Sequence, residues 1–128
     1  MRIGHTDTEE TTVLWVPAIG LVVASDAVYN ITHPYLGESA TKRARLEWIA
    51  ALDKIAALHP KIVVGGHSDP GKDFSPNAIH ETKAYLEDFE RMNEQTPSAE
   101  ELYSSMLELH PNRLNVGSLW GGATLVKN

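Results

Sequence analysis

The sequence contains no cysteine, so it has neither a disulfide framework nor a cysteine-based zinc site. Lysine and arginine are also sparse, 11 residues against 17 aspartates and glutamates, which gives a net charge of −6. Nucleic acids and anionic membrane surfaces need clustered basic residues, so we exclude both as partners. Apolar runs such as "IGLVVA" are far shorter than a membrane span, and the residues after Met1 do not form a signal peptide. We therefore expect a cytoplasmic protein.

Periodicity predicts a mixture of strands and helices within one domain, residues 1–128. Apolar and β-branched runs predict strands over 11–17, 21–25 and 61–66, the first two forming an antiparallel hairpin. Apolar residues at three- and four-residue spacing predict helices over 38–58, from about 76 to 92, and after 98. Residues 110–128 show no clear period, and we expect an irregular tail there.

These elements predict an α/β fold in which a small mixed sheet carries helices on one face. Strands as apolar as 21–25 and 61–66 are typical of sheets that are covered on both faces. The chain has too few elements to cover both. Either two copies pack sheet to sheet as a homodimer, or a missing N-terminal half supplies the second layer.

Three polar residues lie where a predicted strand ends or a loop begins. His5 follows Gly4, Asp26 follows the apolar run 21–25, and His67 follows the run 61–66. Ligand sites gather where strands end, and imidazole with carboxylate is a ligand set for zinc, iron or manganese. The alternative is that the histidines lie on the surface and Asp26 caps a turn.

The segments "GHT", "LVVASDAVYN" and "VVGGH" resemble the second half of a metallo-β-lactamase-fold hydrolase, over about residues 4–86. The resemblance implies half of an αββα sandwich. It also implies that His5, Asp26 and His67 are metal ligands, with Asp26 bridging two metals. The implied cofactor is a divalent metal, zinc first, with iron or manganese possible. The implied chemistry is attack of a metal-bound hydroxide on a carbonyl or phosphoryl centre.

Other residues near these motifs have two readings each. Tyr29, Asn30 and His33 line the substrate entrance if the family geometry holds, and otherwise form a turn before Pro34. Asp7 is expected to be solvated, and the alternative is that it supports the metal ligands from behind.

The family's first metal motif, His-x-His-x-Asp-His, is absent from this chain. We therefore expect the chain to hold zinc weakly and to be inactive alone, with a small-molecule substrate bound only by a full-length parent. Whether the chain itself is an enzyme stays open at this point, as do the substrate and the metal. The alternative is a non-catalytic half-domain that self-associates through its open sheet face.

Overall fold

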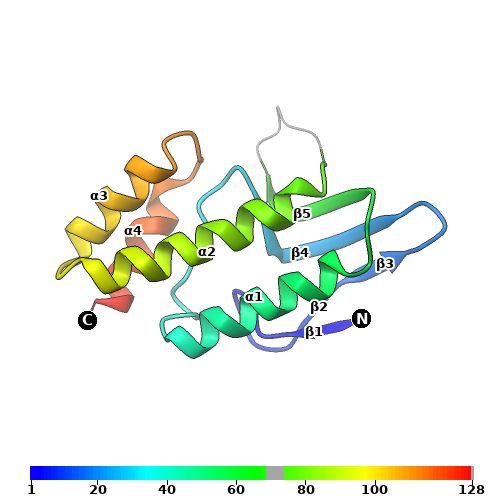
Figure 1. Cartoon of the computed structure of the whole chain (residues 1–128), viewed down its shortest axis with the longest axis horizontal. Coiled ribbons are helices and arrows are strands. Elements are labelled where there is room, and N and C mark those ends of the chain that lie inside the picture. Colours follow the sequence, from blue (N-terminus) through cyan, green and yellow to red (C-terminus); the bar gives the residue numbers. More distant parts are fainter. Residues whose placement is uncertain (69–73, 128) are drawn as a thin grey trace.

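The computed structural model describes residues 1–68 and 74–127, with His67 and Ser68 described by their backbone alone. Five strands and four helices are assigned in this part of the chain (Figure 1). In chain order these are β1 (Arg2–Gly4), β2 (Thr11–Thr12), β3 (Leu14–Val16), β4 (Leu21–Asn30), α1 (Lys42–Ala56), β5 (Ile62–Ser68), α2 (Asn77–Gln95), α3 (Ala99–Leu109) and α4 (Val116–Val126).

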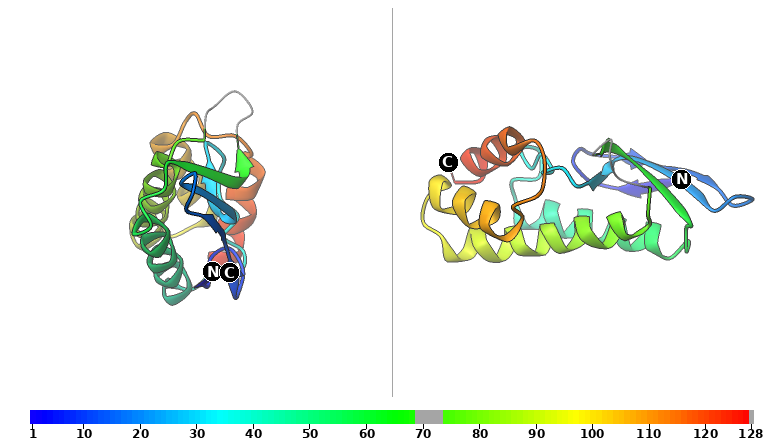
Figure 2. Two further views of the ribbon diagram at one scale, coloured as in Figure 1. Left: turned by 90° about the vertical axis from the view of Figure 1, so that its right-hand side faces the viewer. Right: turned by 90° about the horizontal axis from the view of Figure 1, so that it is seen from above.

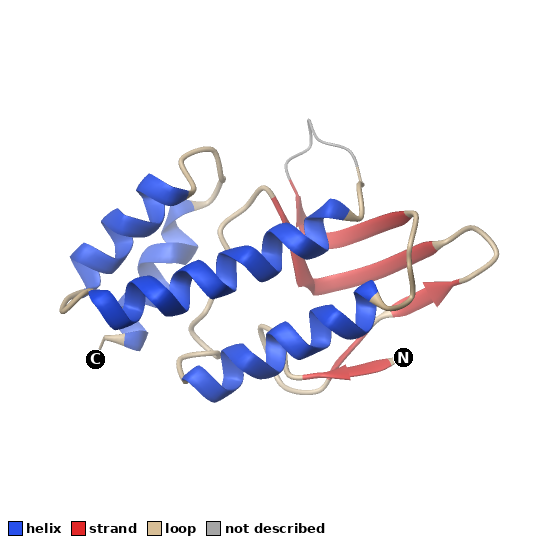
Figure 3. Ribbon diagram, viewed as in Figure 1, coloured by secondary structure: helices blue, strands red, loops and turns tan. Residues whose placement is uncertain are grey.

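The main sheet is mixed, which confirms the predicted fold class (Figure 3). Its strand order is β3-β4-β5, with β3 antiparallel and β5 parallel to the central β4. The predicted hairpin is formed by β3 and β4, with Leu14 opposite Val23. The parallel β4–β5 pair is connected through α1, the crossover that such pairs need.

The predicted strand over 11–17 is wrong in one respect, because it splits between two sheets. Thr11–Thr12 pairs with β1 in a separate two-stranded sheet, and only Leu14–Val16 joins β4. Val13 lies at the changeover, where its backbone N–H and C=O both bond to Met1. Met1 therefore satisfies both backbone hydrogen-bonding groups of Val13 at the point where the chain passes from one sheet to the other.

Helices α1 and α2 lie together on one face of the main sheet (Figure 2). Trp48 of α1 is fully buried and donates its indole N–H to the carbonyl of Ala27 in β4, at 2.9 Å. Thr82 of α2 bonds through its hydroxyl to both the N–H and the C=O of Tyr29. These polar contacts fix the two helices over β4, where the apolar core forms.

The other face of the main sheet carries an apolar patch. Ladder partners share a face of a sheet, so the register sets six side chains side by side there: Leu14, Val16, Leu21, Val23, Ile62 and Val64. Leu14 is 59% exposed and Ile62 is 39% exposed, whereas Val22 and Val63 on the helix-covered face are fully buried. We call these six residues the open sheet face.

Two predicted boundaries change at the helices. The helix expected over 38–58 begins only at Lys42, because the Thr41 side chain caps it by accepting the N–H of Ala44. The irregular tail expected over 110–128 is wrong, since Val116–Val126 forms α4. Leu119 anchors α4 in the core, and Trp120 packs edge-on against Tyr103 of α3. Within the described residues, no helix has the length and apolarity needed to cross a membrane.

Candidate metal centre

A bulge in β4 decides where Asp26 lies. Ser25 pairs with Gly65 and Tyr29 with His67, so β4 carries two more residues than β5 between these two pairs. Ser25 has a φ of +50°, in the left-handed region that residues with a side chain rarely adopt. Bulges of this kind occur beside active sites, where they change the direction of a side chain.

Gly66 leaves room for the Asp26 carboxylate. A Cβ atom at position 66 would lie 2.0 Å from Oδ1 of Asp26 and 2.9 Å from the backbone of Ser25. Any side chain there would displace the carboxylate or the bulge. The glycine immediately before His67 is therefore required by the position of Asp26.

His5 follows β1 and is held through its Nε2 atom. This atom lies 2.9 Å from Oγ of Ser39, whose hydroxyl donates to the Thr6 carbonyl at 2.7 Å. Because the Ser39 proton is used on Thr6, His5 donates from Nε2, and the lone pair of the neutral ring lies on Nδ1. His5 can accept a cation through Nδ1 as it stands, or through Nε2 if the Ser39 bond is given up.

Asp7 is buried, so the expectation that it is solvated is wrong. It is only 9% exposed, and Thr6 donates its hydroxyl to Oδ1 at 3.0 Å. Burial raises the pKa of Asp7, and the charge of Asp26 raises this pKa further against the Thr6 bond. Two carboxylates from distant segments therefore share one electrostatic environment.

Tyr29 belongs to the same environment. It is 3% exposed and stacks at an angle on Trp48, with ring centroids 6.0 Å apart. Burial raises the pKa of its phenol, and the charges of Asp7 and Asp26 raise it further. The phenol stays protonated at neutral pH.

Asn30 and His33 continue from Tyr29 into the interior. Asn30 is 6% exposed and ends β4, while His33 is fully buried with its Nδ1 2.9 Å from the hydroxyl of Tyr85 in α2. His33 thus bonds to the helix layer through Tyr85. Whether Tyr29, Asn30 and His33 line a substrate entrance stays a prediction.

The His67 side chain lies outside the described residues. Its backbone pairs with Tyr29, at the end of the sheet where β4 carries the Asp26 bulge. Among the side chains that the structure does describe, no group of three or more His, Cys, Asp or Glu residues could hold a metal ion. The convergence of His5, Asp26 and His67 on one cation therefore stays a prediction.

Sequence reasoning missed the contributions of Asp7, Ser39 and Gly66. Ser39 is close to His5 only because the loop before α1 folds back on the loop after β1. No periodicity marks such contacts between loops. The double glycine before His67 is the one available signal in the sequence.

Comparison of the sequence with known protein families and with curated proteins finds no match.

Proposed function

We propose that this chain supplies part of the metal site of a metal-dependent hydrolase of the metallo-β-lactamase type. The observation that carries the proposal is the shared environment of Asp7 and Asp26 beside the bulge in β4. A buried carboxylate next to another charged carboxylate is costly unless a cation is near. His5 follows β1, and the backbone of His67 lies opposite Tyr29 near the carboxyl end of β5.

The donor set suits a divalent metal but is incomplete. Carboxylate oxygens and imidazole nitrogens bind zinc, iron and manganese, and His5, Asp26 and His67 would be this chain's ligands. With Asp26 bridging two metals, this chain would give each metal only two ligands. Catalytic zinc needs three protein ligands and a free position, so further ligands would have to come from outside this chain. A metal bound there would supply Lewis-acid polarisation of a substrate oxygen and activation of a water molecule.

The neighbouring residues have positioning roles in this proposal. Ser39 fixes the orientation of the His5 imidazole, as partners of metal-binding histidines commonly do. Gly66 gives the Asp26 carboxylate its room. Tyr29, buried and protonated, excludes water from the side of the site that faces the core.

Zinc binding tests the proposal directly. The purified chain is titrated with zinc against a chromophoric chelator, beside the variants His5→Ala, Asp26→Asn and His67→Ala. We expect weak binding by the unchanged chain and a loss of about tenfold or more in each variant, since each removes a ligand. His80→Ala is the matched control, because His80 is exposed on α2 and lies near His59 and Pro60, which precede β5, whereas His67 lies near the other end of that strand.

Two results would contradict the proposal. One is zinc affinity that is unchanged in all three ligand variants, and the other is an equal loss in the His80 control. Hydrolysis of a generic ester is measured in parallel, and we expect none from the chain alone.

A second candidate function is self-association of a non-catalytic half-domain. The open sheet face favours it, because six adjacent apolar side chains without a charge can pack against the same patch of a second copy. The two candidates differ in one measurement. If the chain supplies part of a metal site, the double variant with alanine at His5 and His67 should lose zinc binding. If the chain is a self-associating half-domain, the same variant should associate as the unchanged chain does.

A further inference from the structure

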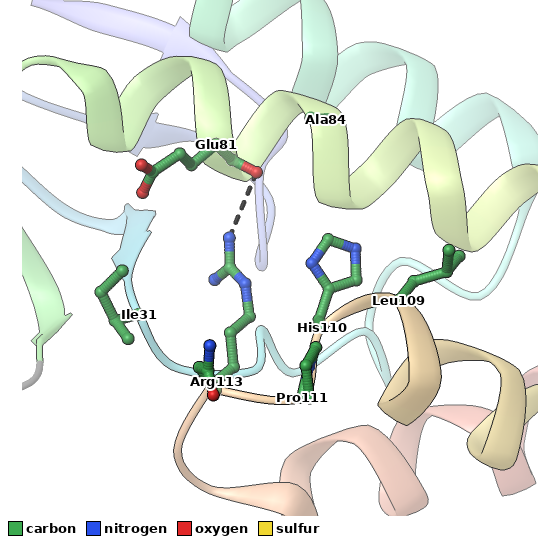
Figure 4. A pocket seen from close by; sticks show the side chains of 8 residues that line it. Ile31, Glu81, Ala84, Leu109, His110, Pro111 and Arg113 are labelled. Carbon is green, nitrogen blue, oxygen red and sulfur yellow. Dashed lines mark hydrogen bonds between the residues drawn. The ribbon is translucent and has the colours of Figure 1, made fainter.

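A pocket lies between α2 and the segment that joins α3 to α4 (Figure 4). Its volume is about 290 Å³. Its lining combines apolar side chains with a few polar ones: Ile31, Glu81, Ala84, Leu109, His110, Pro111, Asn112 and Arg113. Ile31 forms one wall with a φ of +61°, a conformation that β-branched residues rarely adopt.

Arg113 brings a positive charge to this pocket, where the charge of Glu81 attracts the guanidinium without forming a direct ion pair. Its guanidinium donates to the backbone carbonyls of Thr32 at 2.6 Å, Glu81 at 3.2 Å and Tyr29 at 3.4 Å. It forms no ion pair with any of the residues that the structure describes. These bonds use Nη1 and part of Nη2, so Nε–H and one Nη2–H remain as donors.

The guanidinium is held rigidly in this position. Its Cζ atom lies 4.8 Å from the centroid of the Tyr85 ring, and the imidazole of His110 lies 4.7 Å from the same centroid. His110 in turn places Nε2 2.9 Å from Asp88, which fixes the imidazole beside the arginine. Figure 4 shows that Arg113 binds the main chain of Glu81, whose carboxylate points away from the guanidinium.

The geometry points to a binding site for a small carboxylate with a short apolar chain. The two remaining N–H donors of Arg113 match the two oxygens of a carboxylate. Ile31, Ala84 and Leu109 provide apolar contact for the chain of the ligand. None of these residues is a proposed metal ligand, so the carboxylate site does not depend on the proposed function.

Butyrate is the probe for this site. The ¹⁵N-labelled chain is titrated with sodium butyrate at constant ionic strength, and amide chemical shifts are followed by NMR. We expect shifts confined to the residues around Ile31, Ala84 and Arg113, with a Kd on the order of 1 mM. Butyramide has nearly the same shape without the charge, and we expect at least about tenfold weaker binding from it.

A variant that fills the pocket avoids disturbing Arg113, which holds three backbone carbonyls. Ala84→Leu adds bulk at an exposed helix position in the pocket wall, and we expect it to weaken butyrate binding about tenfold or more. Ala50→Leu is the matched control, because Ala50 is also exposed on a helix but lies on α1, outside the pocket. It should bind butyrate as the unchanged chain does.

Three outcomes would overturn the inference. Butyrate and butyramide could give equal shifts or none, which would remove the role of the charge. Inorganic phosphate could bind as tightly as butyrate, which would remove the role of the apolar chain. Butyrate binding could survive in Ala84→Leu, which would place it elsewhere on the molecule.

Discussion

At the scale of single residues, several polar side chains are buried and find their partners in distant segments. Arg113 is held by carbonyls of β4, of the loop after it and of α2, and it stacks on Tyr85. His33 is the most enclosed of these groups. Its Nδ1 bonds to Tyr85, and its Nε2 has no hydrogen-bond partner within the described part of the chain.

The buried His33 predicts a loss of stability in mild acid. Burial, with smaller effects of the charges of Arg113 and His110, lowers its pKa to about 4. In the unfolded chain a histidine has its ordinary pKa of about 6.5. As pH falls from about 6.5 toward 4, the unfolded chain therefore binds a proton that the folded chain does not. The free energy of unfolding should fall by up to roughly 3 kcal/mol over this window.

Urea unfolding at pH 7 and at pH 4.5 measures this effect, with His33→Gln as the test variant. Glutamine does not titrate, so the variant should lose less stability between the two pH values than the unchanged chain does. His110 also has a lowered pKa and contributes a remaining slope of the same sign. His80→Gln, at an exposed position, should keep the full slope, and an unchanged slope in His33→Gln would contradict the assignment.

At the scale of elements, the packing of α1 on α2 includes a buried ion pair. Arg45 of α1 has a side chain only 3% exposed, and its Nε lies 2.6 Å from the Glu90 carboxylate of α2. Its Nη1 donates to the carbonyls of Ser39 and Ala40 just before α1. One arginine therefore joins both helices and fixes the loop that carries Ser39 to His5.

Neutralising Glu90 should destabilise this contact. Glu90→Gln leaves the charge of Arg45 buried beside a neutral amide, and we expect a loss of about 2 kcal/mol in the free energy of unfolding. Glu94→Gln is the matched control on the same helix, since Glu94 pairs with Lys42 in solvent. Exposed pairs of this kind contribute about 0–1 kcal/mol. Urea unfolding measures the free energy of unfolding of both variants. Equal losses would show that the buried pair stabilises the fold no more than the exposed pair does.

At the scale of the whole molecule, the helices cover only one face of the main sheet (Figure 2). The open sheet face is the consequence, with Leu14 and Ile62 among the exposed apolar side chains. An exposed apolar surface of this kind typically marks an interface. The two candidate functions would use it either against a second copy of the chain or against another layer supplied by a partner.

Self-association through the open sheet face predicts a dimer that one charge can disrupt. Leu14→Lys places an ammonium group within the proposed contact, so light scattering should show a shift from dimer to monomer. Leu46→Lys is the matched control, because Leu46 is 53% exposed on α1, away from the sheet. A monomeric unchanged chain, or a dimer that survives Leu14→Lys, would rule out this interface.

The elements with strong local signals were predicted well. The helix expected after residue 98 is confirmed as α3, where the Ser98 hydroxyl accepts the N–H of Glu101. The tail is the counterexample: α4 has no charge pattern and two adjacent glycines, so its helix depends on Leu119 and Ala123 packing into the core. Local helix propensity does not predict a helix that forms because of its tertiary contacts.

The sequence by itself determined the type of most elements, the hairpin and the order of the three polar motifs, because these depend on periodicity and on residues close together in the chain. Only the tertiary structure decided that Asp7 is buried beside Asp26, that Ser39 holds His5, and that Arg113 faces a pocket with His110. Each of these contacts joins segments more than ten residues apart or depends on a bulge in β4. Burial and electrostatic environment are set by such long-range packing, and no local pattern encodes them.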